Sequence, residues 1–134
     1  MPELIVPIRQ RGAVVPFLVR PASRGGAYRK PLTAYLDTGA SASMLDVGVI
    51  GRLGVEPVRT TALNVLGREE VFFHDLYEVE VGLVLPAAPP YWVPLTILGG
   101  AVFPTGAVAA LGRDFLRRFV FTYDGPRERV TLRW

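Results

Sequence analysis

Cysteine is absent from the 134 residues, and histidine and lysine occur once each. Without cysteine the chain can form neither a disulfide framework nor a thiolate metal site, and it has no cysteine nucleophile. The single histidine, His74, does not favour a histidine-rich metal centre or a histidine-driven catalytic triad. Next to Asp75 in a strand-like segment, it is interpreted as a surface residue. We therefore expect no metal and no other cofactor.

Long uninterrupted apolar runs are also missing. Residues 81–112 carry no charge, but five prolines divide this stretch into short pieces, at positions 86, 89, 90, 94 and 104. No piece approaches the roughly 20 apolar residues that a membrane-spanning helix needs. The first residues lack the basic segment and long apolar segment of a secretion signal. We expect a cytoplasmic protein without a membrane partner.

The positive charge is almost entirely arginine and is scattered along the chain. The formal net charge is +3 and the sequence pI is about 9.7. There are pairs such as Arg117 with Arg118 and Arg127 with Arg129, but no block of basic residues alternates with aromatic ones. This pattern is typical of solvated surface charge and does not favour nucleic-acid binding.

The length and apolar content predict one domain covering residues 1–134. Half of the residues are hydrophobic, which is enough to build a buried core in a chain of this size. The mean hydropathy of +0.31 is high for a small soluble monomer. Some of the apolar surface is therefore expected to contact a partner subunit.

Short strands bounded by turn residues account for most of the chain, which predicts an all-β architecture with one or two short helices. In the longest strand-like segment the period of two places Val71, Phe73, Tyr77, Val79, Val81, Leu83 and Leu85 on one face, opposite Glu78 and Glu80. Ser43 or Asp46 is the expected N-cap of the first helix, and Gly54 its end. Strands are predicted at 14–20, 32–36, 58–66, 69–85, 93–103, 119–123 and 128–134, a short apolar segment at 107–111, and helices at 45–53 and 113–118.

Two short motifs bear on function. In Ala34-Tyr35-Leu36-Asp37-Thr38-Gly39-Ala40-Ser41 an apolar run leads one carboxylate into a turn of small residues. Alone, this is ordinary turn chemistry, because Asp and Gly are common turn formers. The second motif, Leu111-Gly112-Arg113-Asp114-Phe115-Leu116, begins late in the chain, and 75 residues separate Asp37 from Gly112.

Together and in this order, the two motifs resemble those of retropepsin-type aspartic proteases, over most of the chain from residue 14 to residue 134. The resemblance implies the acid-protease fold, a closed, barrel-like β domain with a flap hairpin. It also implies that Asp37, Thr38 and Gly39 form the catalytic loop, with Thr38 bonding across a dimer axis. Gly39 would allow a tight turn and the close approach of a substrate strand.

Peptide hydrolysis in this class needs two carboxylates that share a proton, one as general base on water and one polarising the scissile carbonyl. None of the other aspartates, at positions 46, 75, 114 and 124, lies in a second Asp-Thr-Gly turn. One chain thus supplies half of the pair. A twofold homodimer would bring Asp37 and its symmetry mate together, and the dyad would titrate as a coupled unit.

The resemblance also assigns the substrate-binding residues. Ala40 and Ser41 would line the channel, and the hairpin tip Leu66-Gly67-Arg68 would close over an extended peptide that binds as an added strand. Gly112, Arg113 and Asp114 would support the loop. Retroviral members often carry an acidic residue at the position of Ser41, paired with the late arginine. The partner of Arg113 is therefore left open between Asp114, a backbone carbonyl and another group.

Several alternatives stand beside this interpretation. Asp37 could be a simple turn residue, or the nucleophile of an aspartyl-phosphate enzyme, although no acidic cluster for magnesium is apparent. The domain could also be an inactive, protease-like module for dimerisation or peptide binding. Gly99-Gly100 is interpreted as a bend in a buried strand. Residues 4–8 and 130–134 are candidate strands of an intersubunit sheet.

Overall fold

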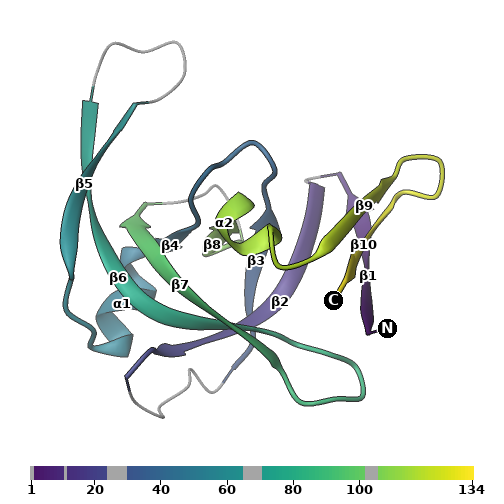
Figure 1. Cartoon of the computed structure of the whole chain (residues 1–134), viewed down its shortest axis with the longest axis horizontal. Helices are drawn as coiled ribbons and strands as arrows, with labels where there is room; N and C mark the ends of the chain where they lie inside the picture. Colours follow the sequence, from purple (N-terminus) through teal and green to yellow (C-terminus); the bar gives the residue numbers. More distant parts are fainter. Residues whose placement is uncertain (1, 11, 24–29, 65–70, 102–105) are drawn as a thin grey trace.

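The computed structural model of the protein describes residues 2–10, 12–23, 30–64, 71–101 and 106–134 (Figure 1). The described residues form mostly β-structure with two short helices, as the sequence predicts. No helix among them is long and apolar enough to cross a membrane. In chain order the elements are β1 (Glu3–Arg9), β2 (Gly12–Pro21), β3 (Leu32–Leu36), β4 (Met44–Asp46), α1 (Val47–Leu53), β5 (Arg59–Asn64), β6 (Val71–Leu83), β7 (Tyr91–Gly100), β8 (Ala109–Leu111), α2 (Arg113–Leu116), β9 (Val120–Asp124) and β10 (Arg129–Arg133).

Six strands close into a ring. Strand β2 pairs with β3 on one side and with β6 on the other, both antiparallel. From β3 the ring continues through β8, β4 and β7, and β7 pairs with β6. Two of these pairings, β3 with β8 and β4 with β7, are parallel. Closure leaves these strands few open edges, and it confirms the predicted barrel-like all-β domain.

The interior of the ring is lined by buried apolar side chains. Alternate residues of β2 point inward, and Val15, Phe17 and Val19 are completely buried. On the facing β6, Val79 and Val81 are completely buried as well, while Glu78 on the opposite face is exposed. The predicted alternation along this part of β6 is confirmed.

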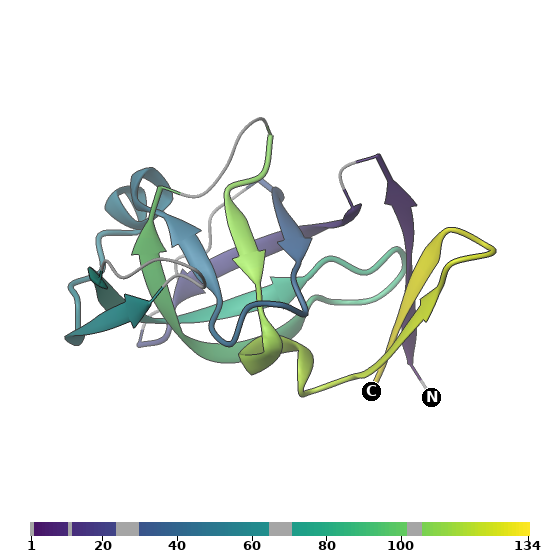
Figure 2. The same cartoon turned by 90° about the horizontal axis from the view of Figure 1, so that it is seen from above.

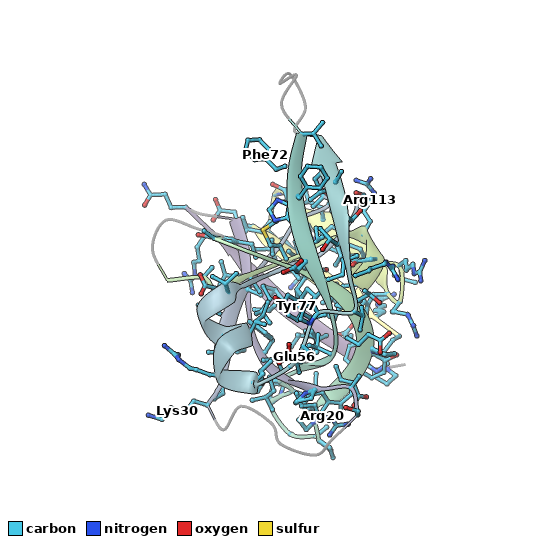
Figure 3. All side chains as sticks on the ribbon, turned by 90° about the vertical axis from the view of Figure 1, so that its left-hand side faces the viewer. Arg20, Lys30, Glu56, Phe72, Tyr77 and Arg113 are labelled. Atoms are coloured by element: carbon cyan, nitrogen blue, oxygen red, sulfur yellow. The ribbon has the colours of Figure 1, made fainter. Side chains whose placement is uncertain are left out.

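The outer part of the β5–β6 hairpin extends beyond the ring (Figure 1). Val71 and Phe73, predicted on the buried face, are 48% and 73% exposed, whereas Leu76 is buried. The predicted burial of Val71 and Phe73 is wrong because this end of β6 extends beyond the ring against which the rest of the strand packs. Figure 3 shows Phe72 near the end of this hairpin, at the end of the molecule opposite Arg20. The proposed flap tip, residues 66–68, lies outside the described residues.

The ends of the chain form a second, three-stranded sheet of β1, β10 and β9 beside the ring (Figure 2). Trp134 donates its backbone N–H to the carbonyl of Pro2 over 3.2 Å, so the two ends meet. Residues 4–8 and 130–134, candidates for strands shared between subunits, pair with each other within one chain. Strand β9 pairs with the other edge of β10. We call these three strands the terminal sheet.

The first helix begins two residues later than predicted. Residues 44–46 form β4 because Leu45 is completely buried between its strand partners on β7 and β8. Asp46 is the N-cap, and its Oδ1 accepts the N–H of Gly48 at 2.8 Å. Gly54 ends the helix in the left-handed conformation, with φ of 68°. The Asp46 cap and the Gly54 end are confirmed.

The two glycines at the end of β7 serve close packing. A Cβ atom on Gly99 would lie 2.8 Å from the ring of Tyr77, and one on Gly100 would lie 2.8 Å from the sulfur of Met44. Both glycines are therefore sites where side chains from other strands approach the backbone. His74 is half-buried, with Nδ1 placed 3.1 Å from the carbonyl oxygen of Gly99. His74 thus lies partly exposed at the surface and also contacts the backbone of β7.

Candidate active site

The parallel pairing of β3 with β8 brings the two sequence motifs together. Leu36 at the end of β3 is in register with Leu111 at the end of β8. Parallel neighbours end at the same edge of a sheet, so both motifs leave the ring at one place. Asp37 extends the pairing by one bond, since its N–H donates to the carbonyl of Leu111 over 2.9 Å.

The Asp-Thr-Gly turn closes on the carboxylate itself. The N–H of Gly39 donates to Oδ1 of Asp37 at 3.0 Å, and the N–H of Ala40 donates to the Asp37 carbonyl at 3.3 Å. Asp37, Thr38 and Gly39 are all exposed. Among the described residues, no hydrogen bond reaches Oδ2 of Asp37. The turn therefore holds the carboxylate by one oxygen and presents the other to solvent.

Arg113 clamps this turn through its backbone and its side chain. The N–H of Arg113 donates to the carbonyl of Ala40 at 2.8 Å, and Nη1 donates to the carbonyl of Thr38 at 2.9 Å. The partner left open by the sequence is thus a backbone carbonyl. The guanidinium needs no acidic side chain at the position of Ser41, because the carbonyl of Thr38 satisfies one of its donors.

Gly112 allows the late motif to approach the turn. A Cβ atom there would lie 2.7 Å from the carbonyl oxygen of Ala40 and 3.0 Å from the carbonyl carbon and oxygen of Ala42. All three are backbone atoms, which cannot move aside as a flexible side chain could. Gly112 therefore serves close approach, since its φ of −90° is accessible to other residues.

Asp114 and Ser43 join the two motifs inside the protein. Ser43 is completely buried; its Oγ donates to Oδ1 of Asp114 at 2.6 Å and its N–H donates to Oδ2 at 3.0 Å. The same Oγ accepts the N–H of Gly112 at 2.9 Å. Phe115 adds a further N–H bond to Asp114 Oδ1, at 2.8 Å. These contacts form a polar cluster, Ser43, Gly112 and Asp114, in which each buried group has a partner.

Ser43 is the site residue that sequence reasoning missed. The sequence predicts Ser43 only as an alternative helix cap, a role that Asp46 fills. It lies among small residues after the turn, and no local pattern marks it as buried. The usable signal is Asp114, whose carboxylate lies next to a buried strand and needs nearby donors.

Of the five residues predicted to bind substrate, the structure describes two. Ala40 is half-buried and Ser41 is exposed, both directly after the Asp-Thr-Gly turn. Leu66, Gly67 and Arg68 fall outside the described part of the chain, so their proposed contact with substrate stays a prediction. The β5–β6 hairpin that carries them rises at the same end of the molecule as the segment joining β3 to β4 (Figure 1).

Asp37 has no acidic cluster around it. In the described ranges no three His, Cys, Asp or Glu side chains gather in a geometry that could hold a metal ion. Asp114, the nearest acidic residue of the late motif, is occupied by Ser43 and the α2 backbone. The described residues of one chain therefore offer a single exposed carboxylate in a rigid turn.

A groove of about 340 Å³ lies beside this turn. Leu36 and Thr38 line it from the ring, and Phe121 and Tyr123 line it from β9 of the terminal sheet. Its remaining lining residues are Ile8, Gly12, Ala13 and Val130. The Asp-Thr-Gly turn and the terminal sheet thus line one groove.

Comparison with solved structures identifies the fold. The chain is similar to a retropepsin-like aspartic protease from Rickettsia conorii, with a TM-score of 0.60 and 17% sequence identity over 98% of this chain and 90% of that one. No family model matches the sequence, and no curated protein matches it. The protein therefore has the retropepsin-like all-β fold.

Proposed function

We propose that the protein is an aspartic endopeptidase that acts as a homodimer, with one Asp-Thr-Gly turn from each chain. The observation that carries the proposal is the Asp37 turn itself. It presents an exposed carboxylate at the carboxyl end of β3, and Arg113, Asp114 and Ser43 hold the surrounding backbone. A catalytic carboxylate must be held in a fixed position, whereas an ordinary surface turn has no such requirement.

The chemistry follows from pairing two such turns. One Asp37, ionised, removes a proton from a water molecule; the other, protonated, donates a hydrogen bond to the scissile carbonyl. The water oxygen attacks the carbonyl carbon, and the amide nitrogen leaves with a proton from the dyad. Two carboxylates this close cannot both ionise cheaply, so the pair shares one proton. Thr38, whose carbonyl is already engaged by Arg113, keeps its hydroxyl for contact across the axis.

The substrate is an extended peptide with apolar side chains. The exposed Val71, Phe72 and Phe73 on the hairpin arm offer apolar surface at the end of the molecule that holds the Asp37 turn (Figures 1 and 3). Main-chain hydrogen bonds from the hairpin would hold the peptide as an added strand, and Ala40 and Ser41 would line its channel. The predicted tip at residues 66–68 would close over it and exclude water.

The test is cleavage of a peptide library from pH 4 to pH 7 by the wild type and by Asp37→Asn. The matched control is Asp46→Asn, because asparagine caps a helix as well as aspartate does. We expect the wild type and the control to cleave and Asp37→Asn to be inactive. Equal cleavage by Asp37→Asn refutes the mechanism, and peptide binding without cleavage by the wild type supports an inactive binding module instead.

A mixing experiment tests whether the two carboxylates come from two chains. With random exchange of subunits, adding an equal amount of Asp37→Asn to a fixed amount of wild type leaves about half of the active homodimers. The rate should therefore fall by about half. A monomeric enzyme would keep its full rate under the same addition.

A further inference from the structure

The terminal sheet has open edges on which another chain could pair. Strand β10 has neighbours on both sides, β1 and β9. Strand β1 is open only along residues 3–7, because β2 occupies the same edge at Ile8 and Arg9. Strand β9 has no partner on its outer side among the described residues. The two candidate edges are therefore those of β1 and β9.

The edge of β1 is a poor template for a further strand. Ile8 donates its N–H to Glu128 on the β10 side at 2.8 Å. Successive residues of a strand turn their backbone groups to opposite sides, so the nitrogen of Pro7 faces the outer edge. Proline has no N–H to donate there, and such residues are how proteins block open strand edges.

The edge of β9 is open and carries its full set of backbone groups. The even-numbered residues of β10 face β1, as the bonds from Ile8 to Glu128 and from Trp134 to Pro2 show. The odd-numbered residues of β10 therefore face β9. Their register partners on β9 are even-numbered. This leaves the N–H and C=O groups of Phe121 and Tyr123 directed at the free edge.

The β9 edge is complementary to itself. If two copies pair antiparallel about an axis through Thr122, Phe121 lies opposite the partner's Tyr123 and Tyr123 lies opposite the partner's Phe121. Aromatic cross-strand pairs of this kind stabilise antiparallel sheets. The one charge on the strand, Asp124, is already balanced within its own chain by Arg127, at 3.0 Å. No like charges would meet.

The apolar faces would also continue from one copy to the other. Tyr123 is 67% exposed, although its register partner on β10, Val130, is buried. Tyr123 and Phe121 line the groove next to Thr38. A twofold axis perpendicular to the sheet keeps this face on the same side in both copies. Both Asp37 turns would then lie above one continuous sheet.

We propose that a second copy of this chain docks along β9, so that the two terminal sheets become one six-stranded sheet beneath the paired Asp37 turns. The proposal rests on the proposed function, since the dyad is the reason for a second copy. It adds which edge makes the contact and which edge, that of β1, stays free.

Three single-cysteine variants test it, because the chain has no cysteine of its own. Ile5, Thr131 and Thr122 lie in one row across β1, β10 and β9, on the same face of the terminal sheet. At a twofold axis through Thr122 the two Cα atoms are about 4.5 Å apart, within disulfide range. Two copies of residue 131 would be three strand spacings apart, roughly 14 Å, and could not be bridged.

Under mild oxidation we expect Thr122→Cys to shift from one-chain to two-chain mass on a non-reducing gel, while Thr131→Cys and Ile5→Cys remain single chains. Cross-linking of Ile5→Cys, or equal behaviour of the residue 122 and 131 variants, overturns the proposal. Sedimentation and peptide cleavage of the wild type separate the two levels of inference. A cleaving dimer in which Thr122→Cys does not cross-link removes only the β9 contact, whereas a monomer that cleaves nothing removes the proposed function as well.

Discussion

Replacing Ser43 by alanine tests the polar cluster that joins the two motifs. The change removes one hydroxyl from a completely buried position. It deletes the bond to Asp114, of 2.6 Å, and leaves the N–H of Gly112 without its acceptor at 2.9 Å. The backbone bond from Ser43 to Asp114 Oδ2 stays in place.

The expected loss follows from these two contacts. A hydrogen bond to a charged group contributes about 1.5–3 kcal/mol, and a buried donor left unpaired costs about 1–3 kcal/mol. The two effects overlap, so we expect Ser43→Ala to lower the free energy of unfolding by about 2–4 kcal/mol. For a domain stabilised by roughly 5–15 kcal/mol this is a large fraction, but the variant should still fold.

The assay is urea unfolding at one fixed protomer concentration, since a dimer's stability depends on concentration. With an m-value of about 1.5 kcal/mol/M, the midpoint should fall by about 2 M with m unchanged. Ser41→Ala is the matched control: it is exposed, lies two residues away in the same loop and should change stability by less than about 0.5 kcal/mol. Equal midpoints for the two variants would refute the role of the cluster.

Three further changes test other contacts. Gly112→Ala places a Cβ 2.7 Å from the Ala40 carbonyl, so thermal unfolding should show a loss of about 1–3 kcal/mol or more; a stability equal to wild type contradicts the close approach. Burial, with nearby acidic charge, raises the pKa of Tyr77 above 10.0, so the folded chain holds this proton more tightly and loses stability as pH rises beyond that value. Tyr77→Phe should lose less stability than wild type between pH 9 and pH 11, and parallel curves would argue against it. The Arg127 hydrogen bond lowers the pKa of Asp124 below 3.8, so the stability that ionised Asp124 contributes is present above that pH and lost as pH falls. The free energy of unfolding of Asp124→Asn should therefore fall less steeply than that of wild type from pH 5 to pH 2.5. An unchanged slope would count against the pair.

Local sequence signals were sufficient for much of the fold. The period of two along β6 and the turn residues between strands predict hairpins whose partners are close in sequence, such as β5 with β6 and β9 with β10. Gly54 and Asp46 mark the limits of α1 for equally local reasons. The predicted burial of the outer end of β6 was wrong. Alternation shows which residues share a face of the strand, but it does not show whether another element covers that face.

The sequence predicts the two motifs of the site but not how they are arranged in space. Nothing near Leu36 indicates that its strand pairs in parallel with one that ends at Leu111, because that pairing depends on closure of the whole ring. For the same reason the partner of Arg113 and the burial of Ser43 could not be read locally. The pairing of β1 with β10 within one chain joins the two ends of the sequence and likewise has no local signal.

The link between β3 and β8 also sets the order in which the protein can assemble. The bond from Asp37 to Leu111 and the contacts of Ser43 with Asp114 join residues 71 to 74 positions apart. Long-range contacts of this kind form slowly, because the intervening chain must first be ordered. A ribosome-bound chain has no Asp37 turn of this geometry until residues 109–116 have emerged. The half-site that the proposed peptidase needs from each chain would thus form only after nearly all of residues 1–116 have been synthesised.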